Sequence, residues 1–160
     1  MKKVLVLSVL GWSLACGGRR DPEPNSCSFP NKNADIHGLQ FASELDPFLA
    51  IKDGDDVRIS TGGQGSPMLF LTLRIMESDD VDCLSQQTQV INDAGVVIGE
   101  VDSPLKTYTY GPNSFTDPIP IILSPMPSPG DALTLKTTAH NLKVKRKVYL
   151  GTKDSGDTGL

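Results

Sequence analysis

The chain of 160 residues has few of the residues on which most enzyme sites depend. It contains two histidines, His37 and His140, which lie far apart in the sequence and beside turn residues. A zinc site or a histidine-activated nucleophile needs more than these two positions supply. The glycine-rich segment 62–66 lacks the Lys-Ser/Thr pair of a phosphate loop, and Ser66 lacks the following glycine of a nucleophile elbow. We therefore expect a protein that is not an enzyme and uses no cofactor.

Tryptophan and positive charge are also scarce. The single tryptophan is Trp12, so the later residues have none to form the Cys–Trp–Cys core of antibody domains. Without Lys2 and Lys3, which belong to residues 1–15, 13 basic and 19 acidic residues remain, a net charge near −6. Nucleic acid is therefore not an expected partner, because phosphate binding needs clustered positive charge. No apolar run after residue 15 is long enough to span a bilayer.

The N-terminal residues have the pattern of an export signal. Lys2 and Lys3 precede the apolar run from Val4 to Leu10, and small residues lead to Cys16. The arrangement resembles a bacterial lipoprotein signal, in which the cysteine at the cleavage point is acylated. The resemblance implies a lipid anchor on Cys16 and a place in the cell envelope, at the outer membrane. Because Ser13 and Ala15 also suit ordinary secretory cleavage, a soluble periplasmic or secreted protein is the alternative.

Cys27 and Cys83 form an even pair once Cys16 is assigned to the lipid. Outside the cytoplasm two such cysteines are expected to form a disulfide. Closing so long a loop would stabilise the fold by about 4 kcal/mol on the chain-entropy model. We expect a structural disulfide rather than a reactive thiol.

The remaining composition divides the chain into three parts after the signal at residues 1–15. Residues 16–35 are polar and rich in glycine, proline and asparagine, which predicts a tether. Residues 151–160 predict a disordered tail. The domain is expected between them, at residues 36–150.

Apolar residues in this domain alternate with a period of two. The clearest run is 68–76, where Leu69, Leu71 and Leu73 share one face. Residues 89–98 predict a hairpin around the turn Asn92-Asp93-Ala94-Gly95. Further strands are expected at residues 48–51, 56–59, 105–110, 119–123, 132–139 and 144–150. With no helical stripe, the pattern predicts an all-β protein, a two-sheet antiparallel β-sandwich.

A family resemblance rests on the turns of this domain. Asp53-Gly54-Asp55-Asp56-Val57 leads through Gly63-Gln64-Gly65 into the long apolar strand, and the last strand pair begins at Asp131-Ala132-Leu133-Thr134. In these features residues 45–150 resemble small bacterial lipoproteins with immunoglobulin-like domains and no assigned activity. The resemblance implies an immunoglobulin-like sandwich, a fold that serves adhesion, binding and structural roles. The predicted function is a non-catalytic binding or structural module whose partner is an envelope protein or a glycan.

Two acidic clusters are the nearest approach to a metal site. They comprise Asp53, Asp55 and Asp56 at one turn and Asp79, Asp80 and Asp82 after the long strand. Carboxylates suit calcium, but the spacing matches no EF-hand loop, and charged turns are usually hydrated strand ends. We expect no metal. The alternative is a calcium-dependent adhesion or carbohydrate-binding domain that holds the ion between the two turns.

A basic cluster lies in the last expected strand and consists of Lys143, Lys145, Arg146 and Lys147. Lysines on an edge strand discourage the pairing of sheets between molecules, which is the interpretation we favour from the sequence. Contact with lipid headgroups or with a polyanion is the alternative.

Overall fold

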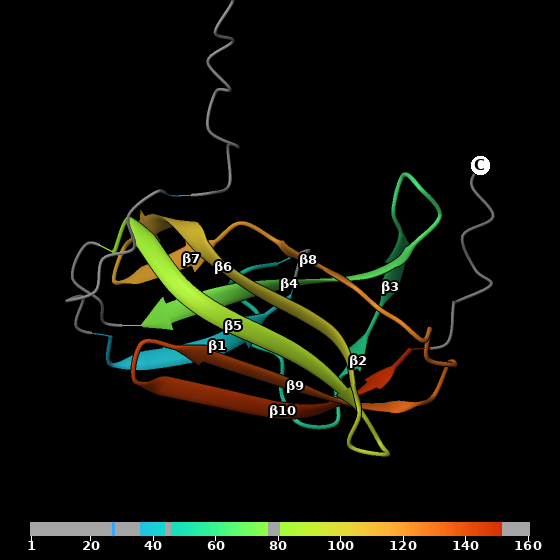
Figure 1. Ribbon diagram of the computed structural model, residues 1–160. Helices are drawn as coiled ribbons and strands as arrows, with labels where there is room; N and C mark the ends of the chain where they lie inside the picture. The colour runs from blue at the N-terminus through green and yellow to red at the C-terminus, as the bar shows by residue number, and fades with distance from the viewer. Residues whose placement is uncertain (1–26, 28–35, 44–45, 77–80, 152–160) are drawn as a thin grey trace, which may run out of the picture.

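The protein is all-β in the parts that the computed structural model describes, which are Cys27 and residues 36–43, 46–76 and 81–151 (Figure 1). No helix occurs in these segments, so the predicted fold class is confirmed at this level. The predicted signal, the predicted tail apart from Gly151 and the predicted tether apart from Cys27 lie outside the described residues. The strands are β1 (Gly38–Ala42), β2 (Asp56–Val57), β3 (Ile59–Thr61), β4 (Pro67–Met76), β5 (Cys83–Asn92), β6 (Val97–Tyr110), β7 (Asn113–Thr116), β8 (Ile119–Ile122), β9 (Ala132–Ala139) and β10 (Leu142–Leu150).

Strand β4 organises the sheet because it changes partners halfway along its length. Its second half pairs with β1 and β7, whereas its first half pairs with β3 and β8, all antiparallel. The alternate residues Leu69, Leu71, Leu73 and Ile75 are at most 1% exposed, as the alternation predicts. Burying each of these side chains stabilises the fold by about 1.5–3 kcal/mol relative to leaving it in water.

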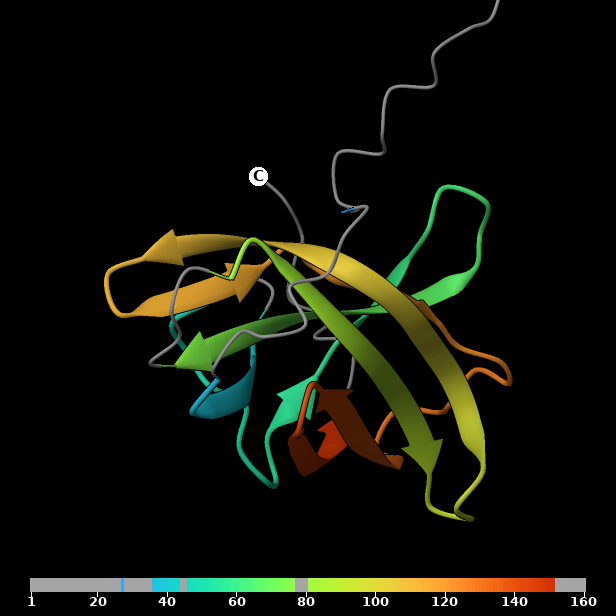
Figure 2. The same ribbon diagram turned by 60° about the vertical axis from the view of Figure 1, so that its left-hand side comes forward.

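Strand β6 makes a second change of partner. Residues 97–106 pair with β5, and residues 107–110 pair with β7. The hydrogen-bonded path therefore runs without a break through β1-β4-β7-β6-β5-β9-β10-β2. The sheet curls into a half-barrel whose concave side holds the core (Figure 2).

Some predicted elements differ from those observed. The sheet is mixed rather than wholly antiparallel, because β2 runs parallel to β10 at Tyr149 and Leu150. That pairing joins segments some ninety residues apart, and the alternation within either strand does not encode its direction. The strand predicted at 48–51 is a turn with one bridge between Ala42 and Ala50. It turns because Asp46 accepts hydrogen bonds from the amides of the two residues that follow Pro47.

The predicted hairpin around Asn92–Gly95 is confirmed. The amides of Gly95 and Asn92 bond the carbonyls of Asn92 and Val96, and Gly95 takes a φ of 78°. A β-bulge follows in the ladder at Val90 and Ile91. Glycine is suited to this position because a side chain strains the left-handed conformation.

A second glycine, Gly99 in β6, allows β8 to approach β6 closely. Gly99 is buried. A Cβ atom at this position would lie 2.8 Å from Ile121 Cγ2 and from Leu123 Cδ2, and 2.9 Å from the Ile122 carbonyl oxygen. The backbone oxygen cannot rotate away as a side-chain atom can. Any side chain at this position therefore separates β8 from β6.

We predict that Gly99→Ala lowers the free energy of unfolding by about 1–3 kcal/mol, because the added methyl group overpacks this contact. Chemical denaturation followed by circular dichroism measures the change. The matched control is Gly63→Ala, since a Cβ atom at Gly63 meets no atom within 4 Å. The control is expected to stay within about 1 kcal/mol of the wild type. Equal stability of Gly99→Ala and wild type would contradict the packing argument.

Candidate binding surface

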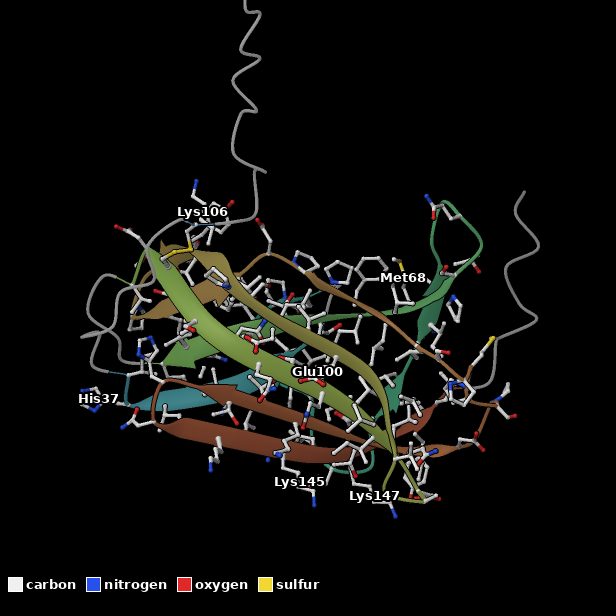
Figure 3. All side chains as sticks on the ribbon, viewed as in Figure 1. His37, Met68, Glu100, Lys106, Lys145 and Lys147 are labelled. Carbon is white, nitrogen blue, oxygen red and sulfur yellow. A yellow bond between two sulfur atoms is a disulfide. The ribbon has the colours of Figure 1, made fainter. Side chains whose placement is uncertain are left out.

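The predicted disulfide joins Cys27 to Cys83, with 5.8 Å between the two Cα atoms. Cys83 is the first residue of β5 and is only 3% exposed, so the bond fastens residue 27 to one end of the sheet (Figure 3). Cys16, the predicted lipidation site, lies outside the described residues.

The described members of the two predicted acidic clusters lie at opposite ends of the sheet. Asp53 accepts a hydrogen bond from the Lys147 amide at 2.7 Å, and Asp55 accepts one from the Lys52 amide at 2.8 Å. These residues and Asp56 therefore lie beside the end of β10. Asp82 instead precedes β5 at the disulfide end.

The remaining predicted calcium ligands, Asp79 and Asp80, lie outside the described segments. Within those segments no three His, Cys, Asp or Glu side chains gather as a metal ligand set. The described carboxylates at 53 and 55 act as acceptors that shape a turn.

The two histidines lie apart. His37 is exposed beside β1, whereas His140 is half-buried in the turn between β9 and β10 at a φ of 51°. The Nε2 atom of His140 is buried and has no hydrogen-bond partner among the described residues.

An exposed group of aromatic rings is the most distinctive surface of the described residues. Tyr108 and Tyr110 are two residues apart on β6 and so share its outer face, and Tyr108 is paired with Phe115 of β7. Phe48 lies edge-on to Phe115 and Tyr110, with ring centroids 5.0 Å and 5.5 Å apart. Phe115 is covered, but Phe48, Tyr108 and Tyr110 are 51%, 45% and 69% exposed. We call these four residues the aromatic surface.

The segment that carries Phe48 is held in place from two sides. On one side the Ser43 amide bonds the Leu49 carbonyl, and the Ile51 amide bonds the Phe41 carbonyl of β1. On the other side Arg74 of β4 donates from Nη1 to the Phe48 carbonyl at 3.4 Å. Its Nε donates to Asn113 Oδ1 at 3.2 Å, which orients the guanidinium group. Hydrogen bonds thus hold the backbone that carries the exposed ring of Phe48, and the ring itself contacts Phe115 and Tyr110.

Tyr108 adds polar groups to the edge of this surface. Its hydroxyl donates to Asp117 Oδ2 at 3.1 Å, and the Lys106 ammonium group lies 5.2 Å from the ring centroid. The hydrogen bond to Asp117 raises the pKa of Tyr108 above its ordinary value, with smaller contributions from burial and from the negative charge. The phenol is therefore protonated at neutral pH and acts as a hydrogen-bond donor.

The sequence predicted only part of the aromatic surface. The alternation in 105–110 places Tyr108 and Tyr110 on one face, and the structure confirms it. Phe48 was missed because residues 48–51 were predicted to form a strand. Its contact with Phe115 spans most of the domain and depends on the turn at Asp46 and on the position of Arg74.

Comparison with known proteins adds no assignment, because no protein-family model matches the chain and no curated protein shows significant similarity to it. In the described segments no helix has the length and apolar character needed to cross a bilayer.

We predict that Asp117→Asn lowers the pKa of Tyr108 toward its ordinary value, because the charged acceptor that favours the protonated phenol is lost. A folded-state pKa above the unfolded value stabilises the fold below the unfolded pKa, and this contribution disappears as pH rises through the folded pKa. Alkaline titration of ¹³C-labelled tyrosine by NMR, assigned with Tyr108→Phe, measures the shift. Asp102→Asn, a change at an exposed carboxylate elsewhere on β6, should leave the titration unaltered. An unchanged Tyr108 pKa in Asp117→Asn would refute the assigned cause.

Proposed function

We propose that the protein is a lipoprotein of the cell envelope, at the outer membrane, and acts there as a non-catalytic binding module. Its partner, an envelope protein or glycan, docks on the aromatic surface. The observation that carries this proposal is the half-exposed ring of Phe48 in contact with the still more exposed Tyr110.

Three arguments support a binding role for this surface. Contiguous exposed apolar side chains are uncommon on monomeric proteins and usually mark an interaction site. Tyrosine, phenylalanine and arginine are enriched at binding interfaces, and aromatic and arginine residues dominate their energetics. The hydrogen bonds that hold the Phe48 segment also reduce the entropy lost on binding.

An immunoglobulin-like sandwich is the finer fold that we propose for the curled sheet. It is supported by β4 and β6, which each change partners midway, as corner strands do when they pass from one packed sheet to another. Such a scaffold is compatible with binding and does not by itself specify a ligand.

We predict that Cys16 carries the lipid. Mass spectrometry of the protein extracted from membranes should show an acylated peptide beginning at Cys16, because the export signal ends there. Cys16→Ser should prevent the modification and move the protein out of the detergent phase in phase partitioning. Recovery of the wild type as a soluble protein with an unmodified Cys16 would favour the secretory alternative.

We predict that Phe48→Ala/Tyr110→Ala weakens capture of the envelope partner by at least about tenfold, because central aromatic residues carry a large share of interface energy. Quantitative pull-down from envelope extracts, with protein and glycan fractions assayed separately, measures the loss. The matched control is Ile122→Ala/Met126→Ala, which removes side chains that are 55% and 64% exposed away from the aromatic surface. The control should bind as the wild type does.

Thermal unfolding of both double variants shows whether the fold is intact. If capture is equal in both variants and in the wild type, the partner does not dock on the aromatic surface and the proposed site is wrong.

A further inference from the structure

The hairpin of β9 and β10 carries a charge opposite to that of the rest of the chain. Residues 36–150 contain nine lysines and arginines, and five of them lie between residues 132 and 150. The same stretch contains no aspartate or glutamate, although the whole chain has a net charge of −4. Positive charge is thus concentrated on one two-stranded unit of an acidic protein.

Four of these side chains share the outer face of the hairpin. Lys143, Lys145 and Lys147 alternate with the buried Val144 and Val148, so they point away from the core. Lys136 of β9 is the cross-strand partner of Lys145. Figure 3 shows Lys145 and Lys147 directed away from the sheet, on the side opposite to Lys106. We call Lys136, Lys143, Lys145 and Lys147 the lysine face.

The direct cross-strand partners of the lysine face carry no negative charge. Lys143 and Lys147 are paired with Thr138 and Thr134, and the Lys136 ammonium group is 3.5 Å from the neutral amide oxygen of Gln89. Described carboxylates lie at the borders of the row: Asp53 bonds the backbone amide of Lys147, Asp56 is paired with Tyr149, and Glu100 is two strands away from Lys136. The centre of the positive face is therefore Lys136, Lys143 and Lys145.

Protection of an open edge does not account for this arrangement. Lysines on β10 discourage strand addition, but β9 lies between β5 and β10 and has no open edge. Lys136 nevertheless projects beside Lys145, although like charges placed opposite each other in a sheet are unfavourable. A ligand with several negative charges removes this repulsion.

We propose that the lysine face docks the domain on an anionic bilayer surface with phosphate-bearing headgroups. The row from Lys143 to Tyr149 extends about 20 Å along the strand, more than a single anion fills. Lysine side chains act as point charges without the planar fork that fits one phosphate. Tyr149 continues the row on the same face and is 40% exposed, and tyrosine is enriched at membrane interfaces. These features favour a membrane over a linear polyanion.

This inference rests on the proposed membrane anchor, and the geometry is compatible with it. Cys27 is fixed at Cys83, at the end of β5 where the β9–β10 turn also lies, since Gln86 is paired with Ala139. The chain between Cys16 and Cys27 can extend at most about 35–40 Å. Cys83 is the cross-strand partner of Lys106, which Figure 3 shows on the side opposite to Lys145 and Lys147, so this length must also span the depth of the domain. The proposal therefore requires that this part of the chain be extended when the lysine face touches the membrane.

Docking in this way also orients the aromatic surface. Figures 1 and 2 both place β7, and the end of β6 that pairs with it, on the side of the half-barrel away from β10. With the lysine face on the bilayer, Phe48 and Tyr110 are turned toward the aqueous phase, where a partner has access to them.

Vesicle co-sedimentation tests the proposal with the mature chain, residues 17–160. This chain keeps every described strand and both cysteines of the disulfide, and it lacks Cys16, so acyl chains cannot contribute. The probes are phosphatidylcholine vesicles with and without phosphatidylglycerol. Binding is expected only to the anionic vesicles and should fall steeply as salt is added, because screening weakens exposed charges.

The variant Lys143→Gln/Lys145→Gln should bind anionic vesicles at least about tenfold more weakly, since each lysine near such a surface contributes about fivefold. The charge-matched control is Lys32→Gln/Lys153→Gln, which changes two lysines outside the hairpin and should bind as the wild type does. Phe48→Ala/Tyr110→Ala should also bind vesicles normally, which separates this inference from the proposed partner site.

Three results would overturn the proposal. They are equal binding to both kinds of vesicle, equal loss in the two lysine variants, and binding to soluble polyphosphate without binding to vesicles. The last result would identify a linear polyanion as the ligand of the lysine face.

Discussion

The fold depends on the burial of one face of β4 in the concave side of a single curled sheet. Leu69, Leu71, Leu73 and Ile75 are excluded from water there, and their strand forms hydrogen bonds with four others. The backbone N–H and C=O groups on both edges of this ten-residue strand need hydrogen-bond partners, and one neighbouring strand can supply them on one edge only. The shorter strands β1, β3, β7 and β8 divide the two edges between them, and the sheet bends where the partners change.

The same bend produces the two surfaces to which we assign function. Beyond the bend in β6, the outer face of β4, β7 and β6 carries Arg74, Phe115 and Tyr108, and Arg74 bonds the segment that presents Phe48. Before the bend, the sheet continues through β5 and β9 to β10 and the lysine face. Because the sheet is curved, the two outer faces point in different directions. The two proposed contacts, with a membrane and with a partner, therefore do not compete for the same surface.

The candidate sites were predictable to different degrees. The lysine face follows almost completely from alternation, because Lys143, Lys145 and Lys147 are spaced two residues apart in a strand predicted from the same pattern. Its fourth member, Lys136, required the register between β9 and β10. The disulfide between Cys27 and Cys83 followed from the even number of cysteines that remains after Cys16 and from the predicted export. The aromatic surface could not be predicted in full. Residues 48–51 have the composition of a strand, but the Asp46 carboxylate accepts a hydrogen bond from the Phe48 amide and the segment forms a turn.

The sequence by itself determined what depends on neighbouring residues: the all-β class, the buried face of β4, the Asn92–Gly95 hairpin and the outward direction of the lysines. A strand alternates its side chains whatever it is paired with, so these properties need no distant contact. Only the tertiary structure decided the parallel pairing of β2 with β10, the close approach of β8 to Gly99 and the meeting of Phe48 with Phe115 and Tyr110. These contacts join segments far apart in the chain, and their geometry is set by how the whole sheet curls around its core.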